Sequence, residues 1–599
     1  MWKINPFNYM RRPADAIQVG TLKIGGDQPI RIQSMANTDT NDIESSVSQA
    51  IRIIDAGGEL VRFTAQGIRE AENLKLIHDS LREKNYHTPL VADIHFAPNA
   101  ADVAACNVEK VRVNPGNYVK SVKALGDTSN YSDEEFRLEY ENIRERFLRL
   151  LAICKENNTA IRIGVNHGSL SERMMNRYGD TSLGMVESCM EFLKICIEND
   201  FRNVVISMKA SNTVFMVQAT RLLVDRMLKE NMSFPLHLGV TEAGDSEDGR
   251  IKSAVGIGAL LVDGIGDTIR VSLSEDPEAE IPVAKQLVKH VSERKNQTFI
   301  DAKISPRYFP FEYKRRKTTA VKNIGNENVP VVISSVKSNY KIQPDYFLQL
   351  GKVIDNKGAE YNIYTLDNLE ETEKDTNELI FLSITLNNLN IYLLDYIKKK
   401  SNFVILLNTA AENTIGEQRA FFHTLLDADC DVPVVICQKY YENDLQELQI
   451  KAACDIGVLL IDGFGDGLLL ENEGNITVEE VNSIAFGILQ AARVRTTKTE
   501  YISCPSCGRT LFDLQTVNAR IKAATSHLTG LKIGIMGCIV NGPGEMADAD
   551  YGYVGTGRGK VSLYKKKECV ERNIPEEDAL DKLIELIKQN GDWHNNCNK

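Results

Sequence analysis

The chain has 599 residues, which is too many for one hydrophobic core, so we expect two to four domains. Its 43% hydrophobic and 25% charged residues are ordinary for soluble globular domains, and its net charge of −12 argues against nucleic acid or an anionic membrane as a partner. No long apolar run is free of charge or glycine, and the N-terminus lacks an apolar signal-peptide core, so we expect a cytoplasmic protein without a transmembrane helix.

Residues 1–290 alternate short strand-like runs with amphipathic helical stretches, the pattern of a parallel α/β domain. Eight strands, the number in a (β/α)₈ TIM barrel, fit a domain of this size. The predicted strands are 30–35, 60–64, 90–94, 110–114, 160–165, 203–208, 236–241 and 259–263.

Charged residues follow most of these strands. In TIM barrels the carboxyl ends of the strands form the active site, and arginine suits bidentate contact with phosphate oxygens. We therefore predict an anionic, phosphorylated ligand, while the alternative is that some of these charges form structural ion pairs with one another. The residues in question include Arg62, Arg112, Arg162 and Lys209, with Asp93, Glu242 and Asp263 as the acidic members.

Two further residues at the barrel mouth have a structural and a functional interpretation. His167 follows Asn166 in a predicted turn, and a lone histidine is more often structural than catalytic, although a loop position favours function. Glu242, within Gly-Val-Thr-Glu-Ala-Gly, is a candidate general acid or base, or else an N-cap or ion-pair partner.

An internal repeat indicates a second barrel in residues 291–495. The sequence GALLVDGIGD at 258–267 recurs as GVLLIDGFGD at 457–466, an offset of 199. The second copy lacks the arginines that end the strands of the first, so we predict a degenerate TIM-like domain that serves as a structural spacer. The basic run 314–317 is expected to lie on a solvated linker.

Residues 496–599 carry a cysteine motif on a predicted α+β domain. Cys504 and Cys507 form a Cys-x-x-Cys pair, and Cys538 follows in a separate glycine-rich turn. Structural zinc normally takes four closed ligands, whereas three thiolates with Glu545 as the nearest oxygen suit a 4Fe–4S cluster with one labile iron. The sequence favours the cluster, and a zinc site is the alternative.

Taken together, these motifs resemble those of the 4-hydroxy-3-methylbut-2-enyl diphosphate synthase family, the iron–sulfur enzymes of the non-mevalonate isoprenoid pathway. The resemblance covers most of the first and last domains, and the middle domain is similar to the insert of the family's longer form. The matching stretches are 33–40 (QSMANTDT), 92–96 (ADIHF), 112–117 (RVNPGN), 162–169 (RIGVNHGS), 207–211 (SMKAS), 239–245 (GVTEAGD), 503–510 (SCPSCGRT) and 537–545 (GCIVNGPGE).

The resemblance implies reductive ring opening and dehydration of 2-C-methyl-D-erythritol 2,4-cyclodiphosphate, with ferredoxin or flavodoxin as the electron donor. It implies Cys504, Cys507 and Cys538 as cluster ligands and Glu545 on the fourth iron until substrate displaces it. Asp93 and Glu242 match acidic residues near the reacting end. The implied substrate-binding residues are Arg62, Arg112, Arg162, Asn166, His167 and Lys209, with Arg509 and Asn541 reaching the substrate from the cluster side.

Three questions stay open at this point. A TIM-barrel lyase or aldolase with a structural zinc site is the rival enzyme, and a non-catalytic scaffold is a second rival that leaves the charged barrel mouth unexplained. The family's short form is thought to join the barrel of one subunit to the cluster domain of its partner. We hypothesise that the inserted domain lets both halves close within one chain, although the chain can still form a homodimer.

Overall fold

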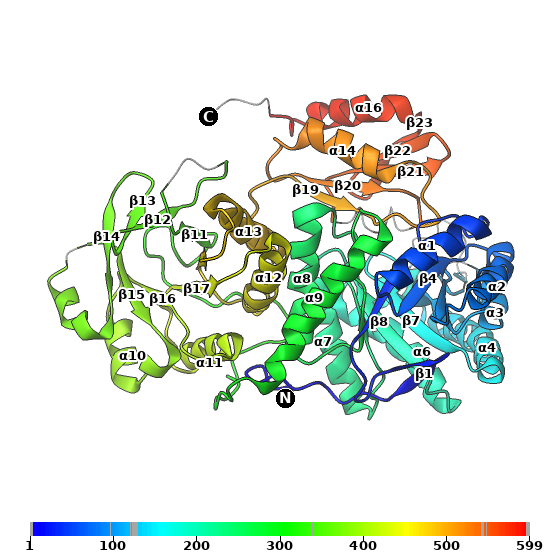
Figure 1. The fold of residues 1–599 in the computed structure, drawn as a ribbon, viewed down its shortest axis with the longest axis horizontal. Helices are drawn as coiled ribbons and strands as arrows, with labels where there is room; N and C mark the ends of the chain where they lie inside the picture. The colour runs from blue at the N-terminus through cyan, green and yellow to red at the C-terminus, as the bar shows by residue number, and fades with distance from the viewer. Residues whose placement is uncertain are drawn as a thin grey trace. The chain divides into compact units, whose positions relative to one another are not determined.

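The computed structural model describes residues 4–95, 97–119, 121–122, 130–337, 341–375, 377–540, 544, 546 and 548–594. They form two compact units built from alternating segments of the chain (Figure 1). The barrel–cluster unit contains residues 12–249, 265–285 and 498–599, and the middle unit contains residues 1–11, 250–264 and 286–497. Each unit is described separately.

The barrel–cluster unit contains the predicted (β/α)₈ barrel. Eight parallel strands pair in the order β8-β7-β6-β5-β4-β3-β10-β9, and a parallel bridge between Ile206 and Leu236 links the two ends of this sheet. The strands are β3 (Arg31–Met35), β4 (Leu60–Thr64), β5 (Leu90–Asp93), β6 (Lys110–Val113), β7 (Ala160–Asn166), β8 (Val204–Lys209), β9 (His237–Leu238) and β10 (Thr268–Ile269).

The helices that connect these strands begin at capping residues. Asp42, Ser132 and Asn212 each accept a hydrogen bond from a backbone N–H of the first turn, which satisfies a donor that the helix itself leaves free. The helices are α1 (Ile43–Asp55), α2 (Ile68–Glu83), α3 (Pro98–Ala105), α4 (Asp133–Asn157), α5 (Glu172–Tyr178), α6 (Ser182–Glu198), α7 (Thr213–Lys229), α8 (Ser246–Val262) and α9 (Glu280–Ser292).

The predicted strand at 259–263 is wrong, because these residues form the end of helix α8 and the turn after it. A short continuous apolar run fits a buried helix as well as a buried strand, so its pattern alone does not decide between them. The eighth strand is β10, which follows a turn at Gly264 (φ 74°). The expectation that Asp263 ends a strand at the barrel mouth is therefore wrong: it lies in the turn after α8, where its Oδ1 is 2.9 Å from Arg419 Nη1.

An N-terminal hairpin packs against apolar residues of the barrel interior. Strands β1 (Ile17–Val19) and β2 (Leu22–Ile24) are antiparallel, and their buried side chains form one cluster with Leu60, Val91 and Val205. Because the active sites of TIM barrels lie at the carboxyl ends of the strands, this apolar layer leaves that face available for function.

The middle unit contains a second barrel, as predicted, and its strands form a closed ring. It is degenerate because β12, β13 and β14 are joined as antiparallel neighbours, so the crossover helices of a regular TIM barrel are replaced there by tight turns. Its strands are β11 (Val331–Ser334), β12 (Tyr346–Gln349), β13 (Lys352–Asp355), β14 (Glu360–Tyr364), β15 (Ile380–Ile384), β16 (Phe403–Leu407), β17 (Val434–Tyr440) and β18 (Gly467–Asn472).

The internal repeat is visible as packing inside the middle unit. Helix α12 (Leu445–Ile461) contacts the part of α8 that belongs to this unit. A Cβ at Gly258 would lie 3.2 Å from the Cα of Cys454, and a Cβ at Gly457 would lie 3.1 Å from the Cα of Val255. With the repeat offset of 199, these are the same contact seen from the two sides, so the repeated segments pack in a two-fold manner.

The expectation of a solvated linker at 314–317 is wrong for Arg316, which is only 7% exposed. Its Nη1 donates to the Cys430 carbonyl at 2.8 Å, its Nη2 donates to the Val432 carbonyl at 2.5 Å, and Asp466 lies 3.6 Å away. Charge patterning alone could not reveal this, because the partners lie more than one hundred residues further along the chain.

The C-terminal domain has the predicted α+β fold and lies above the barrel in Figure 1. Its sheet has the order β19-β20-β21-β22-β23, parallel over the first three strands and antiparallel afterwards. Apolar side chains of α14 and α16 pack against it in one core. The elements are β19 (Glu500–Ser503), α14 (Leu514–Thr525), β20 (Lys532–Met536), β21 (Tyr551–Gly557), β22 (Lys560–Lys565), β23 (Glu568–Pro575) and α16 (Glu576–Gln589).

Candidate active site

A pocket at the carboxyl ends of the barrel strands is lined by residues of both the barrel and the C-terminal domain, within one compact unit. Most of the predicted site residues line it together. From the barrel these are Arg62, Asp93, Arg112, Arg162, Asn166, Lys209 and Glu242, and from the C-terminal domain they are Cys504, Cys507, Arg509 and Cys538. Their individual roles stay predictions.

Asp93, at the end of β5, links the basic residues of the pocket. Its Oδ2 accepts from Arg509 Nη2 at 2.7 Å, and its Oδ1 accepts from Arg112 Nη1 at 3.3 Å. Arg162 Nη2 lies 3.9 Å from the same Oδ1. Burial alone would raise the pKa of Asp93, but Arg62, Arg112 and Arg509 hold it well below its ordinary value, so Asp93 is ionised.

The pocket holds more positive than negative charge. Burial and the neighbouring arginines lower the pKa of Arg62 to about 10, and they hold the pKa of Lys209 well below its ordinary value. Burial likewise lowers the pKa of Arg162, whose Nη1 donates to Ser207 Oγ at 2.8 Å. Crowded cations in a low-dielectric site are stabilised by a bound anion, so the pocket suits a phosphorylated ligand.

Arg270 is a pocket residue that the sequence analysis missed. It directly follows β10, and its Nη2 and Nε donate to the two carboxylate oxygens of Glu280 at 2.9 and 3.1 Å. Arg270 follows a strand as the other arginines do, but the apolar run at 259–263 favours a strand at the wrong place. His95 also lines the pocket, and burial beside Arg112 holds its pKa well below its ordinary value.

Glu242 lines the pocket with a strained backbone. Its φ is 47°, in the left-handed region that residues with a side chain adopt at a cost of order 1–3 kcal/mol. Its side chain is only 2% exposed. Such strain often accompanies function, which favours the acid–base interpretation of this carboxylate over that of an ordinary N-cap.

His167 lies outside the pocket lining. Its Nε2 is 3.0 Å from Asp180 Oδ1, and its ring lies 4.1 Å from that of Phe215. The other oxygen of Asp180 is 3.5 Å from Lys567 Nζ in the C-terminal domain. The contact of His167 is therefore with Asp180, and its direct contact with substrate stays a prediction.

Cys504, Cys507 and Cys538 line one part of the pocket as free thiols. The Gly537 N–H donates to Cys504 Sγ at 3.3 Å, which would stabilise a thiolate there, although burial holds the pKa of this thiol well above its ordinary value. Three soft donors beside one pocket fit a soft metal centre with an open position. The predicted Glu545 and Asn541 lie outside the described residues.

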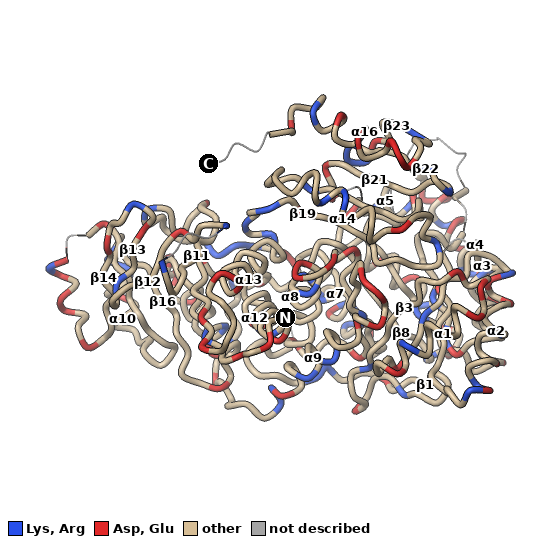
Figure 2. The backbone as a smooth tube through the Cα atoms, turned by 45° about the horizontal axis from the view of Figure 1, so that its top comes forward, with Lys and Arg blue, Asp and Glu red and all other residues tan. Residues whose placement is uncertain are grey.

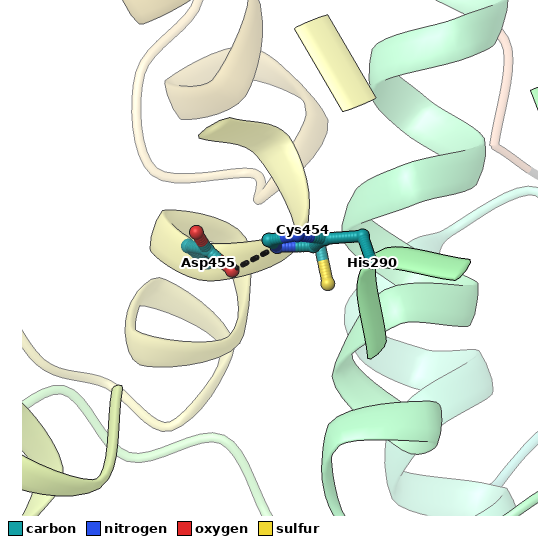
Figure 3. A group of neighbouring side chains, drawn as sticks. All are labelled: His290, Cys454 and Asp455. Carbon is teal, nitrogen blue, oxygen red and sulfur yellow. Dashed lines mark hydrogen bonds and ion pairs between the residues drawn. The ribbon is translucent and has the colours of Figure 1, made fainter. Parts of the chain in front are cut away.

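A second group that could hold a metal ion lies in the middle unit, where His290, Cys454 and Asp455 offer ligand atoms within 4.8 Å of one another (Figure 3). Asp455 is already engaged there. Asp455 Oδ1 lies 2.7 Å from His290 Nε2, and Asp455 Oδ2 accepts a hydrogen bond from the Tyr440 hydroxyl at 3.0 Å. Arg294 Nη1 lies 3.7 Å from Asp455 Oδ1. The arginine already supplies a cation, so the group is best explained as a buried hydrogen-bonded ion pair.

No helix in the part of the chain that the structure describes has the length and apolarity that a bilayer crossing requires. Basic and acidic residues are interspersed along the described chain and do not separate into a basic and an acidic half (Figure 2).

Comparison with known proteins adds independent findings. The family described as the GcpE TIM-barrel domain matches residues 14–285, and the GcpE protein C-terminal domain matches residues 500–589. A relative from Parabacteroides distasonis is 58% identical, covering 98% of this chain and 100% of its own, and one from Phocaeicola vulgatus is 56% identical, covering 98% and 99%. Both carry the name 4-hydroxy-3-methylbut-2-en-1-yl diphosphate synthase (flavodoxin).

Proposed function

The chain belongs to the GcpE family of 4-hydroxy-3-methylbut-2-en-1-yl diphosphate synthases, and from this premise we propose that it is the oxidoreductase that converts 2-C-methyl-D-erythritol 2,4-cyclodiphosphate to (E)-4-hydroxy-3-methylbut-2-enyl diphosphate. The reaction opens a ring and removes one oxygen as water with two electrons. It belongs to the non-mevalonate pathway of isoprenoid biosynthesis.

One observation carries the proposal: three cysteines and an array of basic side chains line the same pocket. A lyase or aldolase acting on a phosphorylated substrate needs the basic residues but has no use for thiols beside them. A structural zinc site would be expected away from the substrate, with four closed ligands. The shared pocket therefore favours a redox reaction on an anionic substrate.

The basic residues bind and orient the diphosphate. Arg62, Arg112 and Arg162 would contact its oxygens, with Lys209 and Asn166 beside them, and Asp93 fixes the Arg112 and Arg509 guanidinium groups by direct ion pairs. Ring opening frees a negative charge on the diphosphate, which these cations stabilise. A substrate held in this way would have its other end facing the cysteines.

Cys504, Cys507 and Cys538 would hold a 4Fe–4S cluster, with Glu545 as the expected fourth ligand before substrate binds. When bound, this cluster supplies electrons one at a time and Lewis acidity at one iron. Glu242, buried in the same pocket, would donate the proton with which the departing oxygen leaves as water. Asn541 and His167 are proposed as further substrate-binding residues.

The names of the relatives support flavodoxin as the one-electron donor, with ferredoxin as the alternative. We propose domains at 1–290, 291–495 and 496–599, with both halves of the site contributed by the same chain; a homodimer of such chains remains compatible with this. A cytoplasmic location belongs to the same proposal, because most of the cysteines lie in apolar stretches of the sequence, as is usual for small core residues in a reducing compartment.

Anaerobic purification followed by iron, sulfide and zinc quantitation tests the proposal. We expect about four irons and four sulfides per chain, together with turnover of the cyclodiphosphate when reduced flavodoxin is supplied. Stoichiometric zinc without sulfide, combined with no turnover, would support the lyase or aldolase alternative. A Cys538→Ala variant should lose both the iron and the turnover.

A further inference from the structure

The middle unit contains a hollow of about 640 Å³, which is within the size range of small-molecule sites. Its lining residues all belong to this unit, so the hollow is separate from the cysteine pocket. The basic run 314–317, for which the proposed reaction has no use, forms part of its lining.

The exposed cations of the hollow exceed its available anions. Lys314, Lys317 and Lys398 line it, and no carboxylate lies within ion-pair distance of any of them among the described residues. Of the three acidic lining residues, Asp429 forms an ion pair with Arg307 and Asp462 lies 2.8 Å from Arg419, which leaves Asp431 opposite the three lysines. An added anion would be stabilised by this excess of positive charge.

Arg316 adds a fixed and buried cation to the lining. Both of its Nη atoms are held by backbone carbonyls, as described above, which fixes the plane of the guanidinium group. Its Nε is buried and has no hydrogen-bond partner among the described residues. A buried donor without a partner is uncommon, and a ligand oxygen entering the hollow would satisfy it.

The lining also has an apolar and aromatic part. The rings of Tyr308 and Phe464 lie 6.0 Å apart with an interplanar angle of 31°, and Leu425 and Leu426 lie in the same lining. Phe309, with the Lys314 ammonium 4.8 Å from its ring centre, is 48% exposed. These groups would remove an apolar or flat body from water, which a bare inorganic anion does not need.

We propose that this hollow binds an organic phosphate or diphosphate, with its phosphate beside Lys314, Lys317 and Arg316 and its apolar or aromatic body against Tyr308 and Phe464. Two sources supply such a ligand. One is a prenyl diphosphate, a class of compound made by reactions that consume the proposed product. This first source rests on the proposed function. The other is a nucleotide, whose base would take the aromatic wall.

Calorimetric titration of the full-length protein, purified anaerobically with its metal centre, tests this proposal. The protein is first saturated with the cyclodiphosphate without reductant, so that the arginine pocket is blocked, and is then titrated with geranyl diphosphate, ADP or inorganic pyrophosphate in separate arms. The test variant is Lys314→Ala/Lys317→Ala. The matched control is Lys303→Ala, which removes an exposed lysine of the same segment that does not line the hollow.

We expect one equivalent of either geranyl diphosphate or ADP to bind, and the responding arm identifies the source. The double variant should weaken this binding at least tenfold, about the effect of losing one charge-assisted contact, while Lys303→Ala and Lys314→Arg/Lys317→Arg retain it. No binding in either organic arm, binding unaffected in the double variant, or equally tight binding of pyrophosphate would overturn the proposal. Turnover is measured in parallel, so failure of the proposed reaction is recognised separately.

Discussion

Arg509 Nη2 donates to Asp93 Oδ2 at 2.7 Å, which joins the cysteine motif to the end of barrel strand β5 through a buried ion pair. The two residues are 416 positions apart. Because Asp93 also accepts a hydrogen bond from Arg112, this one carboxylate fixes a basic residue from each side of the pocket. The proposed substrate would bind beside this ion pair.

We therefore expect Arg509→Ala to lower kcat/KM by at least about 100-fold, since it leaves part of the charge of Asp93 uncompensated in a buried site. Arg509→Lys, which keeps the charge but loses the planar fork, should recover only part of the activity. Anaerobic steady-state kinetics with iron quantitation provides the measurement. Full activity in Arg509→Ala with an intact metal content would remove this residue from the site.

A second prediction concerns the closure of the site within one chain. We expect a mixture of Arg162→Ala and Cys538→Ala chains, unfolded and refolded together, to regain no activity, because a pocket that closes within one chain always contains one of the two defects. Measured turnover above that of either variant alone would show instead that the pocket forms between two chains.

The burial of Lys209 among arginines predicts that the protein takes up a proton when substrate binds. Burial, Arg62 and Arg162 hold its pKa well below 10.5 in the free pocket, and a bound diphosphate favours the charged form and so raises this pKa. Binding between the two pKa values takes up a proton, and affinity therefore falls as pH rises through this window. Calorimetry in buffers of different ionisation enthalpy measures the uptake, which Lys209→Gln should reduce; an unchanged uptake would contradict the assignment.

The burial of His423 predicts that the middle unit loses stability as pH falls. Burial lowers its pKa to about 4, so the unfolded chain binds the proton more tightly than the folded one between about pH 4 and 6.5. Neutral His423 therefore makes its full contribution to the free energy of unfolding above pH 6.5. This contribution decreases as pH falls, by about 2 kcal/mol at pH 5. His423→Asn keeps an acceptor for the Ser305 N–H, and it should flatten the decrease of unfolding free energy between pH 7 and 5. The exposed His87→Asn variant is the control and should retain the decrease.

The two-fold packing of the repeated helices predicts that an alanine substitution lowers stability at a glycine of this contact and not at a glycine elsewhere in the middle unit. Gly258→Ala should destabilise the middle unit by about 1–2 kcal/mol, since overpacking against the Cys454 backbone exceeds the gain in helix propensity. Gly487→Ala is the matched control, because its new Cβ meets only the flexible end of Ile251 within 3 Å, and it should be neutral or stabilising. Denaturant unfolding measures both, and equal effects of the two substitutions would contradict this account.

The sequence predicts most of the barrel because strand-like runs alternate with amphipathic helical stretches, and each of these patterns is local. It could not predict the pairing of Asp93 with Arg509, because no local pattern connects residues so far apart. It misplaced the eighth strand and therefore missed Arg270, since a short apolar run does not distinguish helix from strand. Arg316 was assigned to solvent for the related reason that its acceptors are distant carbonyls.

The packing of Gly258 on Cys454 and of Gly457 on Val255 has a consequence for how this chain can change. In an association of identical subunits, every substitution at a two-fold interface occurs twice, so each contact is altered together with its mirror image. Here the two partners are covalently linked and have already diverged, with valine on one side and cysteine on the other. A mutation now alters one contact and leaves its counterpart intact, so one copy is free to lose catalytic groups while the other keeps them.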